Sequence, residues 1–392
     1  MIPDKRESLL EMPIYLDFNA TTPIHYIVTE AMLPYLEKHF GNPSTSYVYG
    51  QRTKQATEHA REQVAFLIGA SPDEIVFTSG GSESDNQAII GIALANMQRG
   101  RHIITSNVEH PAVTNTCRYL EERLDFRVTY LPVDEYGLIS AEQVRKAVTS
   151  GTILITVMHA NNEVGTIEPI EEIGEVAREY GIPFHTDAAQ SCGKIPVDVA
   201  RLKVDLLTIA GHKLYAPKGI GALYVRSGTN VDPLIHGASQ EQGRRAGTEN
   251  VPYMVGLGVA CELAKEDIEE NGTRVEHLRD RLYARIVEGL GKETVRLNGH
   301  PRKRLPNTLN VSVRGIVGEE LLATIPEIAA STGAACHSGS TEPSSVLLAM
   351  GLSREWALGA LRLSLARSTN QGEVDAAAEL IVDRVRAMKH GA

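Results

Sequence analysis

The stretch "VDLLTIAGHKLYAPKGIGALYV" (Val204–Val225) holds two apolar runs separated by a segment rich in glycine and lysine. Its first run, Val204–Ala210, is typical of a buried β-strand, yet His212 and Lys213 follow it at once. A bare ammonium is costly to bury unless it is paired or neutralised. Lys213 is therefore either a surface lysine or an amine that is joined as an imine to a carbonyl compound.

The chain around this stretch alternates short apolar runs with amphipathic segments rich in Glu, Lys and Arg. The spacing predicts strands at 74–80, 102–107, 126–133, 152–159, 183–189, 205–210 and 221–225. It predicts helices at 82–98, 111–123, 140–148 and 169–181. Strands that alternate with helices in this way indicate an α/β domain with a mostly parallel, seven-stranded sheet covered on both faces.

The pattern changes after Val251, where a long helical stretch (252–290) leads into strands at 308–315 and 360–367. We interpret this part as a smaller α+β domain. The expected division is a large domain at 14–262 and a small domain made of 1–13 and 263–392, with a glycine-rich loop at about 329–345.

Composition excludes several classes of protein. The net charge of -10 gives no overall basic field for nucleic acid or an anionic membrane. The first dozen residues lack the apolar core of a signal peptide, and no run of about 18 apolar residues predicts a membrane span. The four cysteines lie far apart, which argues against a zinc site or a disulfide framework. We expect a reducing, cytoplasmic setting.

Ligands of such sheets bind at the carboxyl ends of the strands, so the residues after each apolar run are informative. "FTSGGSESDN" (Phe77–Asn86) predicts a strand, a glycine-rich turn and a helix start. Gly80 and Gly81 permit a tight backbone, Ser82 is an expected helix cap, and the free N–H groups make an anion site. The stretch is neither G-x-G-x-x-G nor a Walker loop. A plain helix cap is the commoner role for such a turn taken alone.

Other strand ends also carry polar residues: His110, the Asn161–Glu163 segment, Asp187 and Gln190. Each alone is explained by loop chemistry, and Asp187 by a helix cap. Together they form the set that pyridoxal phosphate requires, since its aldehyde needs a lysine imine, its ring nitrogen a carboxylate and its phosphate a helix N-terminus.

These motifs resemble those of a known family over nearly the whole chain. The matching motifs are "YLDFNATTP", "FGNPST", "FTSGGSESDN", "VEHPAV", "HANNEVGTIEP", "HTDAAQSCGK", "TIAGHKLYAPKGIGALY", "RRAGTENVP", "LPNTLNVS", "STGAACHSGS" and "LRLSLAR". The chain resembles the cysteine desulfurases of the NifS/IscS type, which belong to the class V aminotransferase group of fold-type I pyridoxal phosphate enzymes.

The resemblance implies a role for each matching residue. Lys213 forms the imine with the cofactor, Asp187 keeps the pyridine nitrogen protonated, and His110 stacks on the ring. Asn162 and Gln190 contact the ring's phenolic oxygen, and Asn162 and Asn19 also contact the substrate. The phosphate is held by Gly81, Ser82, His212 and, from the partner subunit of a homodimer, Thr248.

Arg362 is the expected ligand of the substrate carboxylate, again by resemblance. The sequence pattern agrees, because the leucines of "LRLSLA" alternate with Arg362, Ser364 and Ala366. Such a strand turns its leucines to the core and Arg362 to an open face, where the guanidinium fork suits a carboxylate.

Cys336 lies in "ASTGAACHSGSTEPSS", a small, polar, glycine-rich segment that we expect to be a mobile loop. A structural cysteine is the commoner role overall, but the resemblance makes Cys336 the nucleophile. Cys117 and Cys261 lie in apolar helical surroundings and are expected in the core. Cys192 is expected near the site without being the nucleophile.

The implied reaction removes sulfur from L-cysteine, gives L-alanine and leaves a persulfide on Cys336. Lys213 takes the α-proton, His110 assists as acid or base, and no metal is required. The sulfur passes to an acceptor protein, such as an iron–sulfur scaffold or a thiolation partner.

Two departures keep alternatives open. Ser82 stands where many relatives have threonine, and His337 directly follows the cysteine where bacterial desulfurases usually have threonine. In that spelling the chain also resembles selenocysteine lyase, which releases selenium from L-selenocysteine. Another class V aminotransferase or lyase would share Lys213 and Asp187 without needing Cys336, and a non-catalytic scaffold would need none of them.

Overall fold

The computed structural model describes residues 12–333 and 342–390. They form two compact units. The larger unit comprises Asn19–Gly272 and Gly299–Leu305, and the smaller unit comprises Thr273–Asn298 with the described parts of Met1–Phe18 and Pro306–Ala392. The domain boundaries expected from the sequence stay a prediction.

The larger unit is built on a seven-stranded sheet with the order β2-β8-β7-β6-β5-β3-β4. Its strands are β2 (Ile75–Thr78), β3 (His102–Ser106), β4 (Arg127–Leu131), β5 (Thr152–Thr156), β6 (Phe184–Asp187), β7 (Leu206–Ala210) and β8 (Gly221–Val225). Only β8 runs against its neighbours among these strands. The predicted α/β class and the mostly parallel, seven-stranded sheet are confirmed.

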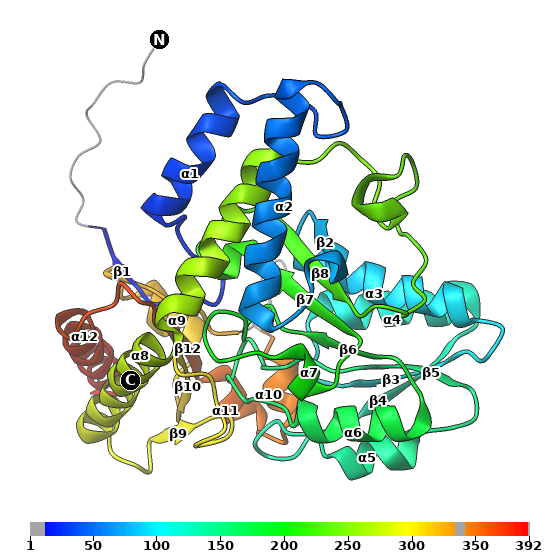
Figure 1. Cartoon of the computed structure of the whole chain (residues 1–392). Helices are drawn as coiled ribbons and strands as arrows, with labels where there is room; N and C mark the ends of the chain where they lie inside the picture. Colours follow the sequence, from blue (N-terminus) through cyan, green and yellow to red (C-terminus); the bar gives the residue numbers. More distant parts are fainter. Residues whose placement is uncertain (1–11, 334–341, 391–392) are drawn as a thin grey trace. The chain divides into compact units, whose positions relative to one another are not determined.

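Helices cover both faces of this sheet, as expected. They are α1 (Tyr26–Glu37), α2 (Val48–Ile68), α3 (Gly81–Asn96), α4 (Pro111–Leu124), α5 (Ala141–Ala147), α6 (Ile170–Tyr180), α7 (Val199–Leu202) and α8 (Val251–Leu290), with single 3-10 turns at η1 (Pro72–Glu74), η2 (Gly211–Lys213) and η3 (Gln240–Gly243). Helix α8 continues into the smaller unit from Thr273. Helices α3 and α4 lie side by side in Figure 1.

The strand period of two divides the buried apolar residues into two cores. On β7, Leu206 belongs to one core with residues of α3 and α4 such as Ile89 and Leu120. Its neighbour Leu207 belongs to the other core, with residues of α2, α6 and α8. A strand buried on both faces reads as a nearly continuous apolar run, and Leu206–Ala210 has this pattern with Thr208 as the one polar residue.

The parallel register places the site residues along one edge of the sheet. Asp187, the last residue of β6, is paired with Thr208 of β7. Strand β7 ends two residues later and turn η2 begins at Gly211. The chain therefore brings Asp187 and Lys213 to the same carboxyl edge.

The smaller unit has its own core around an antiparallel sheet with the order β12-β10-β9. Its elements are β1 (Ile14–Tyr15), β9 (Val295–Leu297), β10 (Thr308–Val313), α9 (Gly318–Ala323), β11 (Ile328–Ala329), α10 (Ser345–Ala349), α11 (Arg354–Leu358), β12 (Ala360–Ser364) and α12 (Gln371–His390). Strands β1 and β11 form a separate parallel pair. The α+β character expected for this part of the chain is present.

Among the helices of residues 12–333 and 342–390, none combines the length and the apolar character that a membrane span needs.

Candidate active site

Lys213 lies at the end of turn η2, and its ammonium is satisfied by backbone oxygens. Nζ donates to the carbonyl of Asn19 at 2.5 Å and to that of Ala20 at 2.7 Å. Gly211 makes the turn possible, because a Cβ there would lie 2.8 Å from the carbonyl oxygen of Ile220. The half-buried lysine is thus not a plain surface residue.

Asp187 and His110 lie within electrostatic reach of Lys213. Burial raises the pKa of the Asp187 carboxyl, while the Ala189 N–H and the charges of His110 and Lys213 act in the opposite direction. The Ala189 N–H donates to Asp187 Oδ1 at 2.9 Å. Burial is also the main cause that lowers the pKa of His110. The predicted lysine, carboxylate and imidazole therefore meet at one sheet edge.

His110 is also the N-cap of α4, where its Nδ1 accepts from the Ala112 N–H at 3.1 Å. An accepting Nδ1 assigns the proton of the neutral ring to Nε2. This contact leaves Nε2 as the ring nitrogen for proton chemistry.

Asn19 connects the other predicted amides. Gln190 Nε2 donates to the carbonyl of Asn19 at 3.0 Å, and Asn19 Nδ2 donates to the carbonyl of Asn162 at 3.2 Å. Asn19 and Gln190 are buried, at 1% and 6% exposure. The segment after Phe18 is therefore joined by hydrogen bonds to the segment after Asp187 and to Asn162.

Lys194 is a residue of this network that the sequence reasoning did not single out. Its Nζ donates to Gln190 Oε1 at 2.7 Å and to Asn19 Oδ1 at 3.2 Å. Its position four residues after Gln190, within "HTDAAQSCGK", was the available signal.

The start of α3 supplies backbone N–H groups at the same edge, because β2 carries Thr78 to the turn at Gly80. The expectation that Ser82 caps the helix is wrong: the N-cap is Gly80, which has φ +149° and no side chain to cap with. Ser82 is exposed in the first turn instead. Gly81 lies close to β7, since a Cβ there would be 3.2 Å from the Ala210 Cβ.

His212 stands next to Lys213 and contacts the segment after Asn19. Its Nδ1 lies 3.3 Å from Thr21 Oγ1. Burial, followed by the charge of Lys213 and those of Lys218 and Lys194, lowers the pKa of His212 to about 4. His212 is therefore neutral at pH 7 in this structure.

Thr248 is exposed and follows a strained turn that is anchored by charge. Glu241 and Gln242 have φ of 49° and 60°, which non-glycine residues rarely adopt. Arg245 Nε pairs with Glu83 Oε1 at 2.8 Å, which connects the segment before Thr248 to the first turn of α3.

Two more acids are buried behind Asp187. Burial and then the charge of Asp187 raise the pKa of Asp85 well above its ordinary value. Burial also raises the pKa of Glu109 to about 8, although Ser106 and Met158 donate to its carboxyl. Burial therefore favours the protonated form of both acids, whereas the charges of His110 and Lys213 act on Asp187 in the opposite direction.

Arg362 lies in the smaller unit, where it is buried rather than on the open face that the alternation predicted. Leu361 and Leu363 are fully buried as expected, but Arg362 is only 8% exposed. Its Nη2 donates to Asp17 Oδ1 at 2.8 Å, which explains how the guanidinium is accommodated.

Three of the four cysteines lie in the described residues, and they are placed as the sequence suggested. Cys117 and Cys261 are fully buried, so the prediction of core residues is confirmed. Burial, then the charge of Asp187, raises the pKa of the Cys192 thiol, which makes it a poor nucleophile. Cys336 and His337 lie outside the described residues.

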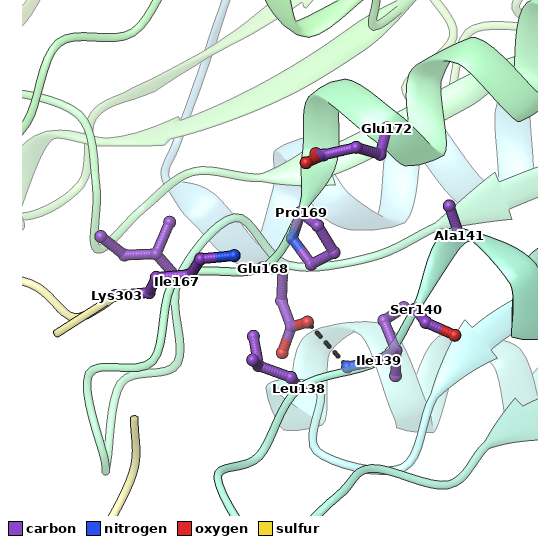
Figure 2. Close-up of a pocket in the computed structure, with 9 residues that line it drawn as sticks. All are labelled: Leu138, Ile139, Ser140, Ala141, Ile167, Glu168, Pro169, Glu172 and Lys303. Atoms are coloured by element: carbon purple, nitrogen blue, oxygen red, sulfur yellow. Dashed lines mark hydrogen bonds between the residues drawn. The ribbon is translucent and has the colours of Figure 1, made fainter. Parts of the chain in front are cut away.

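A separate pocket of about 380 Å³ lies elsewhere in the larger unit (Figure 2). Its buried carboxyl, Glu168, accepts from the Ile139 N–H at 3.0 Å. Burial raises the pKa of Glu168 well above its ordinary value, which favours the neutral form of this carboxyl. None of the predicted site residues lines this pocket.

Known proteins of the family suggested by the motifs match this sequence over nearly its full length. The family model described as Aminotransferase class-V matches residues 14–377. The cysteine desulfurase IscS of Methanosarcina thermophila is 52% identical over 380 residues, which covers 96% of this chain and 93% of that relative.

Solved structures agree. A NifS-like protein has a TM-score of 0.89 at 37% identity and covers 96% of this chain and 100% of its own. SspA in complex with cysteine has a TM-score of 0.79 at 42% identity and covers 90% of this chain and 98% of its own. The chain therefore belongs to the aminotransferase class-V family and, within it, to the cysteine desulfurases of the IscS and NifS type.

Proposed function

We propose that this chain removes sulfur from L-cysteine, releases L-alanine and holds the sulfur as a persulfide on Cys336. The observation that carries the proposal is the meeting of Lys213, Asp187 and His110 at one sheet edge, in a chain of the cysteine desulfurase family. One similar protein has been solved in complex with cysteine.

The site residues fit pyridoxal phosphate, the cofactor of this family. Asp187 is buried, and burial raises the pKa of its carboxyl although the charges of His110 and Lys213 act in the opposite direction. A protonated ring nitrogen would supply a further positive charge. The start of α3 offers N–H groups without a side-chain cap, which suits a phosphate.

On this proposal, Lys213 binds the cofactor's aldehyde, Asp187 its ring nitrogen and His110 its ring face. Asn162 and Gln190 contact the phenolic oxygen. The residues for the phosphate are Gly81, Ser82, His212 and the Thr248 of a second subunit. When bound, pyridoxal phosphate acts as an electron sink for the amino-acid substrate.

The chain's own residues then divide the work. Arg362 holds the substrate carboxylate, with Asn19 and Asn162 beside it. The amine of Lys213 takes the α-proton, and Nε2 of His110 assists as acid or base.

Sulfur transfer falls to Cys336, because the thiolate is the nucleophilic form of cysteine. Its thiolate attacks the substrate sulfur, so that an S–S bond forms as the C–S bond breaks. The electron pair of the C–S bond stays with the carbon, which is protonated to give alanine. L-cysteine and the Cys336 thiol thus become L-alanine and the Cys336 persulfide, with no external oxidant.

We further propose a homodimer. Large apolar side chains are exposed along the segment 24–49 and include Tyr26 and Val48 at 66% each and Phe40 at 78%. Monomers rarely expose such an apolar set, so a second copy of the chain is the expected cover. The dimer would also allow Thr248 to serve the neighbouring site.

The persulfide sulfur is expected to pass to an acceptor protein, for iron–sulfur clusters or thiolated products. The scattered cysteines agree with a reducing, cytoplasmic location, which stays a prediction.

The test is to supply the purified chain and pyridoxal phosphate with L-cysteine and, separately, with L-selenocysteine. Alanine, sulfide and selenide are measured. We expect alanine and sulfide from L-cysteine in the presence of a reductant. Turnover of L-selenocysteine alone would identify a selenocysteine lyase, and amino transfer to a keto acid would identify an aminotransferase.

A further inference from the structure

Lys194 is placed by a tight turn that follows Asp187. Its N–H donates to the carbonyl of Ser191 at 3.0 Å. Gly193 has φ +73°, and a Cβ there would lie 1.9 Å from Leu214 Cδ1. The turn therefore requires glycine, and it packs directly against the residue that follows Lys213.

The side chain of Lys194 returns from this turn to the amide network. It is half-buried, and its Nζ donates to the side-chain oxygens of Gln190 at 2.7 Å and of Asn19 at 3.2 Å. Its positive charge also contributes to lowering the pKa of His212. Lys194 is thus a second cation beside Lys213, and it is bound to side chains where Lys213 is bound to backbone carbonyls.

An ammonium carries donors only, so it decides which way a neighbouring amide faces. Both amide oxygens must point at Lys194, and both NH₂ groups must point away from it. The NH₂ group of Asn19 accordingly donates to the carbonyl of Asn162. The NH₂ group of Gln190 donates one N–H to the carbonyl of Asn19, which leaves its second N–H for a ligand.

We propose that Lys194 is a positioning residue, which fixes the amide of Gln190 so that its N–H faces the anionic phenolic oxygen of the cofactor. The inference rests on the proposed function, because it assumes that pyridoxal phosphate binds beside Lys213. Without Lys194 only the carbonyl of Asn19 still holds the Gln190 amide in this orientation, and the amide can more easily turn over and present its oxygen. The amide oxygen of Gln190 and the phenolic oxygen of the cofactor would then face each other. Their repulsion would favour a cofactor that holds a proton between or near these two oxygens.

The test follows the visible absorbance of the cofactor-loaded protein as a function of pH. In Lys194→Met the midpoint of this titration should rise by about one pH unit, since a hydrogen bond to a charged group is worth roughly a tenfold change in an equilibrium constant. Lys194→Arg keeps the donors and should stay near the wild-type midpoint. If Lys194→Met does not fold, Lys194→Leu, which also has no donor, has the same expected shift.

Lys218→Met is the matched control. Lys218 is exposed and also acts on His212 by charge, but no hydrogen bond links it to Gln190 or Asn19 in the described residues. Its removal changes the net charge equally and should leave the midpoint nearly unchanged. A shift as large as that of Lys194→Met would overturn the proposal.

The Gln190→Ala background separates positioning from charge. If Lys194 acts through the Gln190 amide, Lys194→Met should add almost no further shift in that background. A full additional shift would show a direct charge effect and would overturn the proposal. A wild-type protein without any visible band would instead refute the proposed cofactor, which distinguishes the two failures.

Discussion

Replacing Glu241 by glutamine tests how the turn that leads to Thr248 is held. The Glu241 carboxylate accepts from Arg61 Nη1 and Nη2 at 2.7 and 2.8 Å and from the Phe77 N–H at 2.8 Å. Both partners of the ion pair are buried, at 8% exposure for Glu241 and 6% for Arg61. The pair therefore joins α2, β2 and η3 inside the larger unit.

The expected cost follows from this burial. Glutamine removes the buried counter-charge of Arg61 and turns an NH₂ group toward one of its donors. The guanidinium keeps only the half-exposed Glu58, whose Oε2 lies 3.5 Å from Arg61 Nε. Breaking a buried pair in this way costs about 3–5 kcal/mol. Burial lowers the pKa of Arg61, while the hydrogen bonds and charges of Glu241 and Glu58 raise it. A guanidinium stays protonated at neutral pH, so Arg61 keeps its charge when Glu241 is replaced.

The assay is urea unfolding followed by far-UV circular dichroism. Glu171→Gln is the matched control, since Glu171 pairs with Arg201 at 3.1 Å and with Lys203 at 3.6 Å, and its own side chain is partly exposed rather than buried. The control should barely change the unfolding midpoint. Cofactor affinity should also fall in Glu241→Gln, because the strained turn before Thr248 loses its anchor. A loss of stability in Glu241→Gln no larger than that of the control would refute the reasoning.

Three further predictions concern the cofactor lysine, a buried acid and assembly. Lys213→Ala should lose the visible band that borohydride bleaches and should not turn over L-cysteine; near-normal turnover would exclude Lys213 from its proposed role. Burial raises the pKa of Glu109 from 4.5 to about 8, so its contribution to the free energy of unfolding is complete below pH 4.5 and is lost as pH rises through 8. Glu109→Gln has no proton to lose, and its stability should fall less than that of the wild type over this range; equal slopes would show that Glu109 is ionised throughout. Sedimentation should find the active protein as a dimer, and a fully active monomer would exclude the proposed role of Thr248 across the subunit boundary.

The sheet of the larger unit was largely predictable because its strands are buried on both faces. Nearly continuous apolar runs such as Leu206–Ala210 are visible in the sequence, and the polar residues after each run mark the carboxyl edge. This is why Asp187, His110 and Lys213 could be named before any coordinates. The direction of β8 was less predictable, since the same apolar run suits a parallel or an antiparallel neighbour.

Contacts that depend on turn geometry were not predictable in the same way. Lys194 reaches Gln190 only because Gly193 takes a positive φ. Ser82 has the right chemistry for a cap, but the helix begins at Gly81, two residues earlier than a cap at Ser82 would place it, so Gly80 takes the N-cap position. Arg362 follows a correct strand prediction, yet pairing with Asp17, far away in sequence, buries it.

The central claim is that Cys336 accepts the sulfur of L-cysteine, and Cys336→Ser tests it most directly. Serine keeps the approximate size but cannot form a persulfide, so the variant should bind pyridoxal phosphate and L-cysteine and then stop. Alanine formation from L-cysteine should fall by orders of magnitude, with a tenfold loss for about each 1.4 kcal/mol of added barrier. The same variant is also given L-selenocysteine, whose selenolate is a better leaving group. Selenide release by the variant serves as an internal check that the site is intact. Full retention of alanine formation from L-cysteine would show that Cys336 is not the nucleophile and would contradict the proposed mechanism.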